Sequence, residues 1–124
     1  MGLFAKYKMR HTITGDLLKV TYSGKITKVE IEEIMNKIFV IIKENPGIRK
    51  MLIDARESDL TINVQDSLAM AKKQPEEIKS VKTAIVEKAS KKEQYEMFEM
   101  FAGNRDFPMQ FFNSVPEAEN WLVN

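Results

Sequence analysis

The hydrophobic positions of the chain change period several times, from the alternation typical of strands to the three- and four-residue spacing typical of helices. Residues 9–14 alternate between apolar and polar types, and residues 17–23 are rich in apolar and β-branched types. Gly15-Asp16 between them is a two-residue connection of the hairpin type. The pattern therefore predicts that the chain opens with an antiparallel pair of strands.

A long amphipathic helix is predicted after the hairpin. Thr27 and Glu30 form a T-x-x-E capping box, in which each side chain satisfies a backbone N–H of the first turn. Asn45-Pro46-Gly47 ends the helix, because proline cannot continue the hydrogen-bond ladder. Between these signals, apolar residues recur at helical spacing: Ile31, Ile34, Met35, Ile38, Phe39 and Ile42.

The rest of the chain alternates short apolar runs with helix signals. The runs at 51–54 and 83–86 predict buried parallel strands, residues 109–112 predict the last strand, and a polar connection is expected over 56–61. Each run is followed by a helix-capping pair: Asn63 with Asp66, Ser90 with Glu93, and Ser114 with Glu117. Pro75 interrupts the first of these three helices, Gly103 is the expected C-terminal cap of the second, and the third turns Ala118, Trp121 and Leu122 inward.

The predicted order of elements is β-β-α-β-α-β-α-β-α. Strands that alternate with helices lie parallel and are joined by right-handed crossovers, whereas the opening hairpin is antiparallel. We therefore expect a single α/β domain over residues 1–124, with a five-stranded, mostly parallel (mixed) sheet and four helices.

Composition removes several classes of chemistry. The chain has 124 residues, no cysteine and one histidine, which excludes thiol nucleophiles, cysteine-based metal sites and multi-histidine sites; we expect no metal and no cofactor. A net charge of +1 without a long basic run argues against nucleic-acid binding. The longest apolar run, Ile38 to Ile42, is too short to span a membrane, and no signal-peptide core precedes it. A cytoplasmic protein is expected.

The C-terminal segment FFNSVPEAENWLVN, together with the opening hairpin and the strand ending Leu52-Ile53-Asp54, resembles the SpoIIAA-like family. This family is related in fold to STAS domains and to the CRAL-TRIO lipid-binding domain. Its C-terminal signature corresponds here to Glu117, Ala118, Trp121 and Leu122. The resemblance implies a fold for the whole chain but no activity, because most members have no assigned function.

The resemblance also implies one candidate regulatory residue. Related anti-sigma-factor antagonists bind a partner kinase and are switched by phosphorylation of a serine in a loop of the type Asp-Ser-Ser-Gly, just before the second helix. Asp66-Ser67-Leu68-Ala69 stands in that region, without the glycine and the second serine, which makes Ser67 a candidate phospho-switch. Alternatively, Asp66 and Ser67 are first-turn residues that complement the helix dipole.

Polar residues follow the ends of the predicted parallel strands. Because ligands of open α/β sheets bind beyond the carboxyl ends of the strands, these residues form a candidate ligand rim: Asp54, Arg56, Ser58, Glu87 and Ser114. The alternative is that they are ordinary polar loop residues. Nothing in the spacing requires Asp54 and Glu87 to meet as an acid–base pair, and no triad order involves His11. With phosphate-loop and nucleophile motifs also absent, the sequence predicts no enzyme.

The segment around residues 95–102 carries more apolar residues than one helix face can hold. Tyr95, Met97, Met100 and Phe101 are therefore a candidate interface with a protein partner or with a second copy of the chain. A helix buried deeply between the sheet and a neighbouring helix, or the mouth of an apolar pocket, would explain the same pattern.

These observations lead to two functional hypotheses. The first is a non-enzymatic regulatory module of the SpoIIAA-like type that acts through contacts with an unknown protein partner, with self-association left open. The second is a carrier or sensor of a small molecule or lipid, bound in an apolar pocket between the sheet and the helices.

Overall fold

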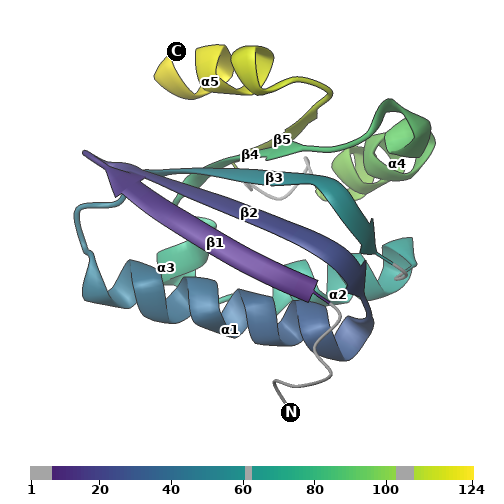
Figure 1. The fold of residues 1–124 in the computed structure, drawn as a ribbon, viewed down its shortest axis with the longest axis horizontal. Helices are drawn as coiled ribbons and strands as arrows, with labels where there is room; N and C mark the ends of the chain where they lie inside the picture. The colour runs from purple at the N-terminus through teal and green to yellow at the C-terminus, as the bar shows by residue number, and fades with distance from the viewer. Residues whose placement is uncertain (1–6, 61–62, 103–107) are drawn as a thin grey trace.

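The chain forms one sheet flanked by helices (Figure 1). The computed structural model describes residues 7–60, 63–102 and 108–124, apart from the side chains of 64, 101 and 102. The strands are β1 (Tyr7–Thr14), β2 (Leu17–Ile26), β3 (Lys50–Leu60), β4 (Lys82–Val86) and β5 (Met109–Phe112). The helices are α1 (Lys28–Glu44), α2 (Val64–Lys72), α3 (Glu76–Lys79), α4 (Lys92–Ala102) and α5 (Val115–Val123), with a 3-10 turn, η2 (Ala89–Lys91), before α4.

The strands follow one another in the order β1-β2-β3-β4-β5, so each lies beside its neighbour in the sequence. The β1–β2 pair is antiparallel and the other three pairs are parallel, which confirms the predicted mixed sheet of five strands. Gly15 in the hairpin has a φ of 61°, a backbone conformation that glycine adopts without a steric penalty.

Two apolar cores lie on opposite faces of the sheet. The larger core joins β2 and β3 to α1, with Leu18, Val20 and Ile34 fully buried in it. The smaller core joins β3 and β4 to α5 through Leu52, Val86 and other buried residues. Figure 1 shows α1 and α3 on one side of the sheet and α5 on the other, with α4 near β5. The strands β3 and β4 therefore bury residues on both faces, as their continuous apolar runs predict.

Most of the predicted helix signals have the expected geometry. The Thr27 backbone N–H donates to Glu30 Oε1 at 3.0 Å, which completes one half of the capping box of α1. Asn63 Oδ1 accepts from the Asp66 N–H at 2.7 Å, and Ser114 Oγ accepts from the Glu117 N–H at 3.3 Å. These contacts place the starts of α1, α2 and α5 where the sequence predicts them.

The prediction of a polar connection over 56–61 is wrong, because β3 continues to Leu60. The cause lies in β2, which also extends to Ile26 and pairs in parallel with residues 57–60 of β3. The register shifts between Thr21 and Ser23, so the strand accommodates a local irregularity and then resumes pairing. Backbone pairing with β2 therefore makes residues 57–60 a strand, although their side chains are mostly polar.

The predicted number of four helices is also wrong. The interruption at Pro75 divides the second predicted helix into α2 and the short α3, and Pro75 itself stands at the N-cap of α3. Ser90, the expected N-cap of the next helix, lies inside η2, whose own N-cap is Lys88. Gly103, its expected C-cap, lies outside the described residues. Within the described ranges, no helix is long and apolar enough to cross a membrane.

Candidate functional site

A cavity of about 210 Å³ lies between the sheet and the helices on the α1 side. The parallel strands form its floor, and α1, α2, α3 and α4 contribute residues to its wall. The apolar part of that wall includes Met35, Met51, Ile53, Met70, Ile85 and Met109. Such a concave, mainly apolar space beside a few polar groups is the usual form of a small-molecule site.

Tyr22 and Glu87 are two of the polar residues that line the cavity, and the register of three strands places them on the same face of the sheet. The other polar lining residues include Ser67, Gln74, Lys79, Thr83, Lys91 and Gln94. Thr21 pairs with Asp54, and Asp54 pairs with Val86, so these residues form one row across β2, β3 and β4. Tyr22 and Glu87 come one residue after this row, and both line the cavity. Successive residues of a strand point to opposite faces, which is why Tyr22 and Glu87 share the face that Thr21 and Val86 do not.

Glu87 is an almost fully buried carboxylate, with 6% of its surface exposed. Burial raises the pKa of its carboxyl group, while the hydrogen bond from the Lys88 N–H and the positive charges of Lys91 and Lys88 act in the opposite direction. The two ammonium groups are engaged elsewhere: Lys88 Nζ donates to the Ser58 carbonyl at 2.7 Å, and Lys91 Nζ donates to the Leu60 carbonyl at 3.4 Å. Among the described residues, the Glu87 carboxylate therefore forms no ion pair.

Tyr22 also lines the cavity, and 5% of its surface is exposed. Burial raises the pKa of its phenol, and the negative charges of Glu87 and Asp54 raise it further. The hydroxyl group therefore keeps its proton at neutral pH and remains a hydrogen-bond donor. Tyr22 is not among the site residues predicted from the sequence, and the only local signal is its hydroxyl group in the apolar run after Leu18 and Val20.

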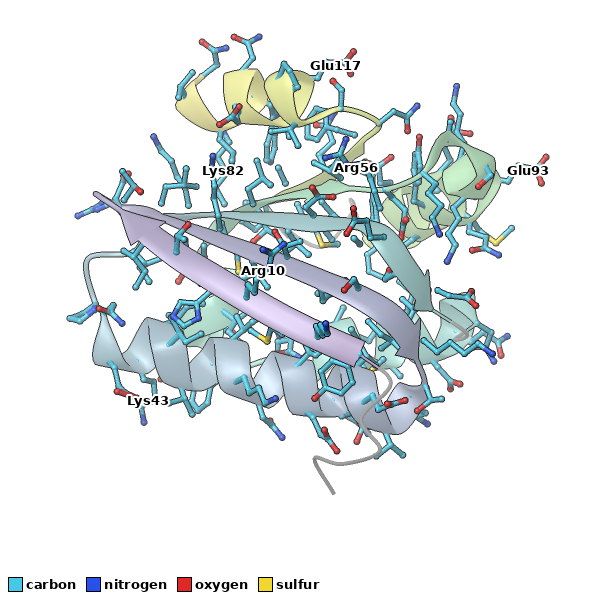
Figure 2. The ribbon with its side chains drawn as sticks, viewed as in Figure 1. Arg10, Lys43, Arg56, Lys82, Glu93 and Glu117 are labelled. Atoms are coloured by element: carbon cyan, nitrogen blue, oxygen red, sulfur yellow. The ribbon has the colours of Figure 1, made fainter. Side chains whose placement is uncertain are left out.

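The residues of the predicted ligand rim do not lie together in the structure. Asp54 and Arg56 form a bidentate ion pair, with Nε–Oδ1 and Nη2–Oδ2 distances of 2.9 and 2.8 Å. Figure 2 shows Arg56 on the α5 side of the sheet. The ion pair holds the pKa of the Asp54 carboxyl below its ordinary value. The Ser58 hydroxyl is buried and donates to the Ala55 carbonyl at 2.6 Å, and Ser114 caps α5. Of the predicted rim, only Glu87 lines the cavity; a ligand role for the others stays a prediction.

The predicted interface on α4 is also divided. Tyr95 and Phe98 are buried, whereas Met97 and Met100 are 48% and 62% exposed. The Phe101 side chain lies outside the described residues. Tyr95 and Phe98 therefore fix the helix to the protein, whereas much of the surface of Met97 and Met100 is exposed.

An aromatic cluster holds α4 against the edge strand β5. The Tyr95 ring stacks on Phe111 with a centroid distance of 5.1 Å, and Phe98 meets the same ring edge-on at 5.7 Å. The Tyr95 hydroxyl donates to Asn113 Oδ1 at 2.5 Å. Glu99 Oε2 accepts the Phe111 backbone N–H at 2.8 Å, so a side chain of α4 satisfies a donor of the edge strand.

Ser67 lies in the first turn of α2, half-buried, and lines the cavity. Its hydroxyl donates to the Asn63 carbonyl at 3.1 Å. The neighbouring Asp66 carboxylate lies 3.7 Å from Lys28 Nζ. The role of Ser67 as a phospho-switch stays a prediction. In the part of the chain that the structure describes, histidine and acidic residues form no group suited to a metal ion.

Replacing Glu87 by glutamine is expected to stabilise the protein at neutral pH. Because the folded state raises the pKa of this carboxyl group above its ordinary value of 4.5, the unfolded chain releases the proton first. The free energy of unfolding therefore falls as the pH rises through this range, and Glu87→Gln removes the loss. In urea unfolding, the variant should be more stable than the parent at about pH 7 and equal to it near about pH 4. Glu32→Gln, at an exposed position of α1, is the matched control and should show no such pH-dependent difference.

Comparisons with known proteins identify the fold. No protein-family model and no curated protein sequence match the chain. An anti-sigma factor antagonist from Mycobacterium paratuberculosis matches with a TM-score of 0.64 and 13% identity, over 95% of this chain and 95% of its own. An uncharacterised protein with a SpoIIAA-like fold from Shewanella loihica matches with a TM-score of 0.56 and 23% identity, over 94% and 93%. The Bacillus cell fate determinant SpoIIAA in its phosphorylated form matches with a TM-score of 0.56 and 14% identity, over 95% and 99%. The chain has the SpoIIAA-like fold that its sequence predicts.

Proposed function

We propose that the protein is a cytoplasmic regulatory module that acts through protein–protein contacts and catalyses no reaction. The observation that carries this proposal is the match of 95% of the chain to a protein described as an anti-sigma factor antagonist. A second antagonist, SpoIIAA in its unphosphorylated form, matches over 94% of the chain with a TM-score of 0.60.

The surface that we propose for partner binding is the pair Met97 and Met100 on α4. Both side chains are largely exposed, and methionine adapts to irregular apolar surfaces. The aromatic contacts of Tyr95 and Phe98 with Phe111 keep α4 in place, so the pair is presented from a fixed helix. A second copy of the chain is one alternative occupant of this surface, and a different regulatory protein is the other.

The double substitution Met97→Glu with Met100→Glu is expected to abolish partner binding and to leave the fold intact. Two added charges on an exposed helix face already containing Glu93 and Glu96 should cost less than about 1 kcal/mol. Circular dichroism should be unchanged, whereas a homodimer, if present, should become a monomer in light scattering.

A photo-reactive residue tests the same surface in the living host. Placed at position 97, it should cross-link a defined protein adduct that disappears in a Met100→Glu background. The matched control places it at Val29, which is 67% exposed on α1. An unchanged solution mass in the double variant, together with identical adducts from positions 97 and 29, would contradict the proposed surface.

A small-molecule carrier or sensor is a second candidate function, favoured by the cavity of about 210 Å³ between the sheet and the helices. Its position agrees with the apolar pocket expected from the sequence. Native mass spectrometry of the protein purified from its host distinguishes the two functions. A co-purifying small mass supports the carrier, whereas a co-purifying protein supports the regulatory module.

A further inference from the structure

The hydroxyl group of Tyr22 has no hydrogen-bond partner among the described residues, although only 5% of the surface of this residue is exposed to solvent. In the described part of the chain, every side-chain nitrogen or oxygen atom that is completely buried has a hydrogen-bond partner. The Tyr22 hydroxyl is therefore not enclosed in the core. Because Tyr22 lines the cavity, this donor opens into it.

Glu87 supplies an acceptor at the same end of the cavity. One carboxylate oxygen accepts the Lys88 N–H at 3.0 Å, and no described side chain donates to the other. The ammonium groups of Lys88 and Lys91 are bonded to carbonyl groups at the end of β3, as described above. A free donor and a free acceptor thus face the same space, which is the arrangement that a hydroxyl group of a ligand satisfies by accepting one hydrogen bond and donating another.

The remainder of the wall suits an aromatic ring. Four methionines line the cavity, Met35, Met51, Met70 and Met109, and thioether sulfur makes favourable contacts with aromatic rings. Phe98 and Phe111 add aromatic surface to the same wall. An apolar cavity of about 150 Å³ holds one benzene molecule. The volume of about 210 Å³ therefore leaves room for one ring with short substituents.

The wall of the cavity favours a neutral ligand. Charges of both signs line the cavity: Glu87 repels a carboxylate head group and attracts an ammonium group, whereas Lys79 and Lys91 do the reverse. These opposing effects leave no net preference for either charge. Either ion would, however, lose its hydration on entering an apolar cavity. A neutral hydroxyl group avoids this cost.

We propose that the cavity is a binding site for a small neutral phenol, with the ring among the methionines and its hydroxyl group between Tyr22 and Glu87. The phenol donates to the Glu87 carboxylate and accepts from the Tyr22 hydroxyl. This proposal rests on the second candidate function, the small-molecule carrier or sensor, and is independent of the Met97 and Met100 surface.

Calorimetric titration with four ligands of matched size tests the proposal: 4-ethylphenol, ethylbenzene, 4-ethylbenzoate and 4-ethylbenzylamine. We expect 4-ethylphenol to bind at least about tenfold more tightly than each of the other three, because it alone satisfies both hydrogen bonds without a charge. Carbon-13 labelling of the methionine methyl groups should show shifts at Met35, Met51, Met70 and Met109, with Met97 as the internal control on the exterior of α4.

Two tyrosine variants separate a hydroxyl contact from simple packing. Tyr22→Phe should weaken 4-ethylphenol binding about five- to tenfold and leave ethylbenzene binding unchanged. Tyr7→Phe should leave both affinities unchanged, because Tyr7 does not line the cavity and its hydroxyl group donates to Glu33. Circular dichroism confirms that each variant is folded before it is titrated.

Three results would overturn the proposal: no saturable binding of 4-ethylphenol, tighter binding of the benzoate or the benzylamine, or equal losses in the two tyrosine variants. Tight binding of the benzoate would instead indicate a site for organic acids, and binding of ethylbenzene alone would indicate a carrier without a head-group contact. None of these results affects the proposed partner surface, because that surface is tested by the adduct from position 97.

Discussion

Replacing Ile38 by alanine is expected to lower the free energy of unfolding by about 2 to 5 kcal/mol. Ile38 is fully buried in the middle of α1, where it joins the core between this helix and the sheet. Removal of its outer carbons loses the favourable burial of apolar surface and leaves a space that the packed neighbours fill only in part. Equilibrium unfolding in guanidinium chloride measures the change directly.

Val40→Ala provides the matched control for this experiment. Val40 lies two positions later on the same helix, but 50% of its surface is exposed. Its substitution should change the free energy of unfolding by no more than about 0.5 kcal/mol. Equal losses in the two variants would contradict the expectation that burial against the sheet determines the contribution of Ile38, because alanine has the higher helix propensity at both positions.

Replacing Phe111 by alanine is expected to cost about 3 kcal/mol, near the lower end of the range for aromatic residues because Phe111 is only half-buried. Its ring is the shared contact of Tyr95 and Phe98, the two residues that fix α4 to β5. Its loss should therefore loosen α4 more than the rest of the protein. Hydrogen exchange should increase most at the amides of α4, and thermal unfolding should begin at a lower temperature.

Gln110→Ala tests whether this effect comes from the ring. Gln110 precedes Phe111 on β5 and is exposed, so its substitution should leave both stability and the exchange of α4 nearly unchanged. Unaltered exchange of α4 in the Phe111 variant would show that the helix is held by the Glu99 hydrogen bond and not by the aromatic cluster. If the ring is the main contact, the Phe111 variant should also lose the cross-linked adduct from position 97, since α4 no longer presents it in a fixed orientation.

Local signals in the sequence were sufficient wherever an element depends on neighbouring residues along the chain. The capping box at Thr27 and Glu30, the spacing of the buried isoleucines and the break after Glu44 define α1 without reference to the sheet. The last strand has the predicted bounds, Met109–Phe112, and the helix after it begins at the predicted cap, Ser114. The SpoIIAA-like fold followed from this order of elements together with the C-terminal signature.

Signals were insufficient where a contact with a distant segment decides the structure. The second half of β3 contains charged residues and looks like a loop, but pairing with the extended β2 makes it a strand. Likewise, Tyr95 and Met97 are both apolar residues of one helix, and only the position of Phe111 determines which of them is buried. Asp54 and Glu87 both follow the apolar core of a strand, yet they face opposite sides of the sheet because their positions in the strand register differ by one residue.

The sequence by itself determined the order of the elements, the hairpin, the amphipathic α1, the mixed sheet and the absence of cysteine chemistry, because these depend on local spacing and residue type. The tertiary structure alone decided that Tyr22 and Glu87 share one end of a cavity and that Met97 and Met100 remain outside. Strand register and helix packing bring together residues that are far apart in the sequence, and side-chain direction reverses with each step along a strand. No local pattern contains that information, and the candidate site depends on it.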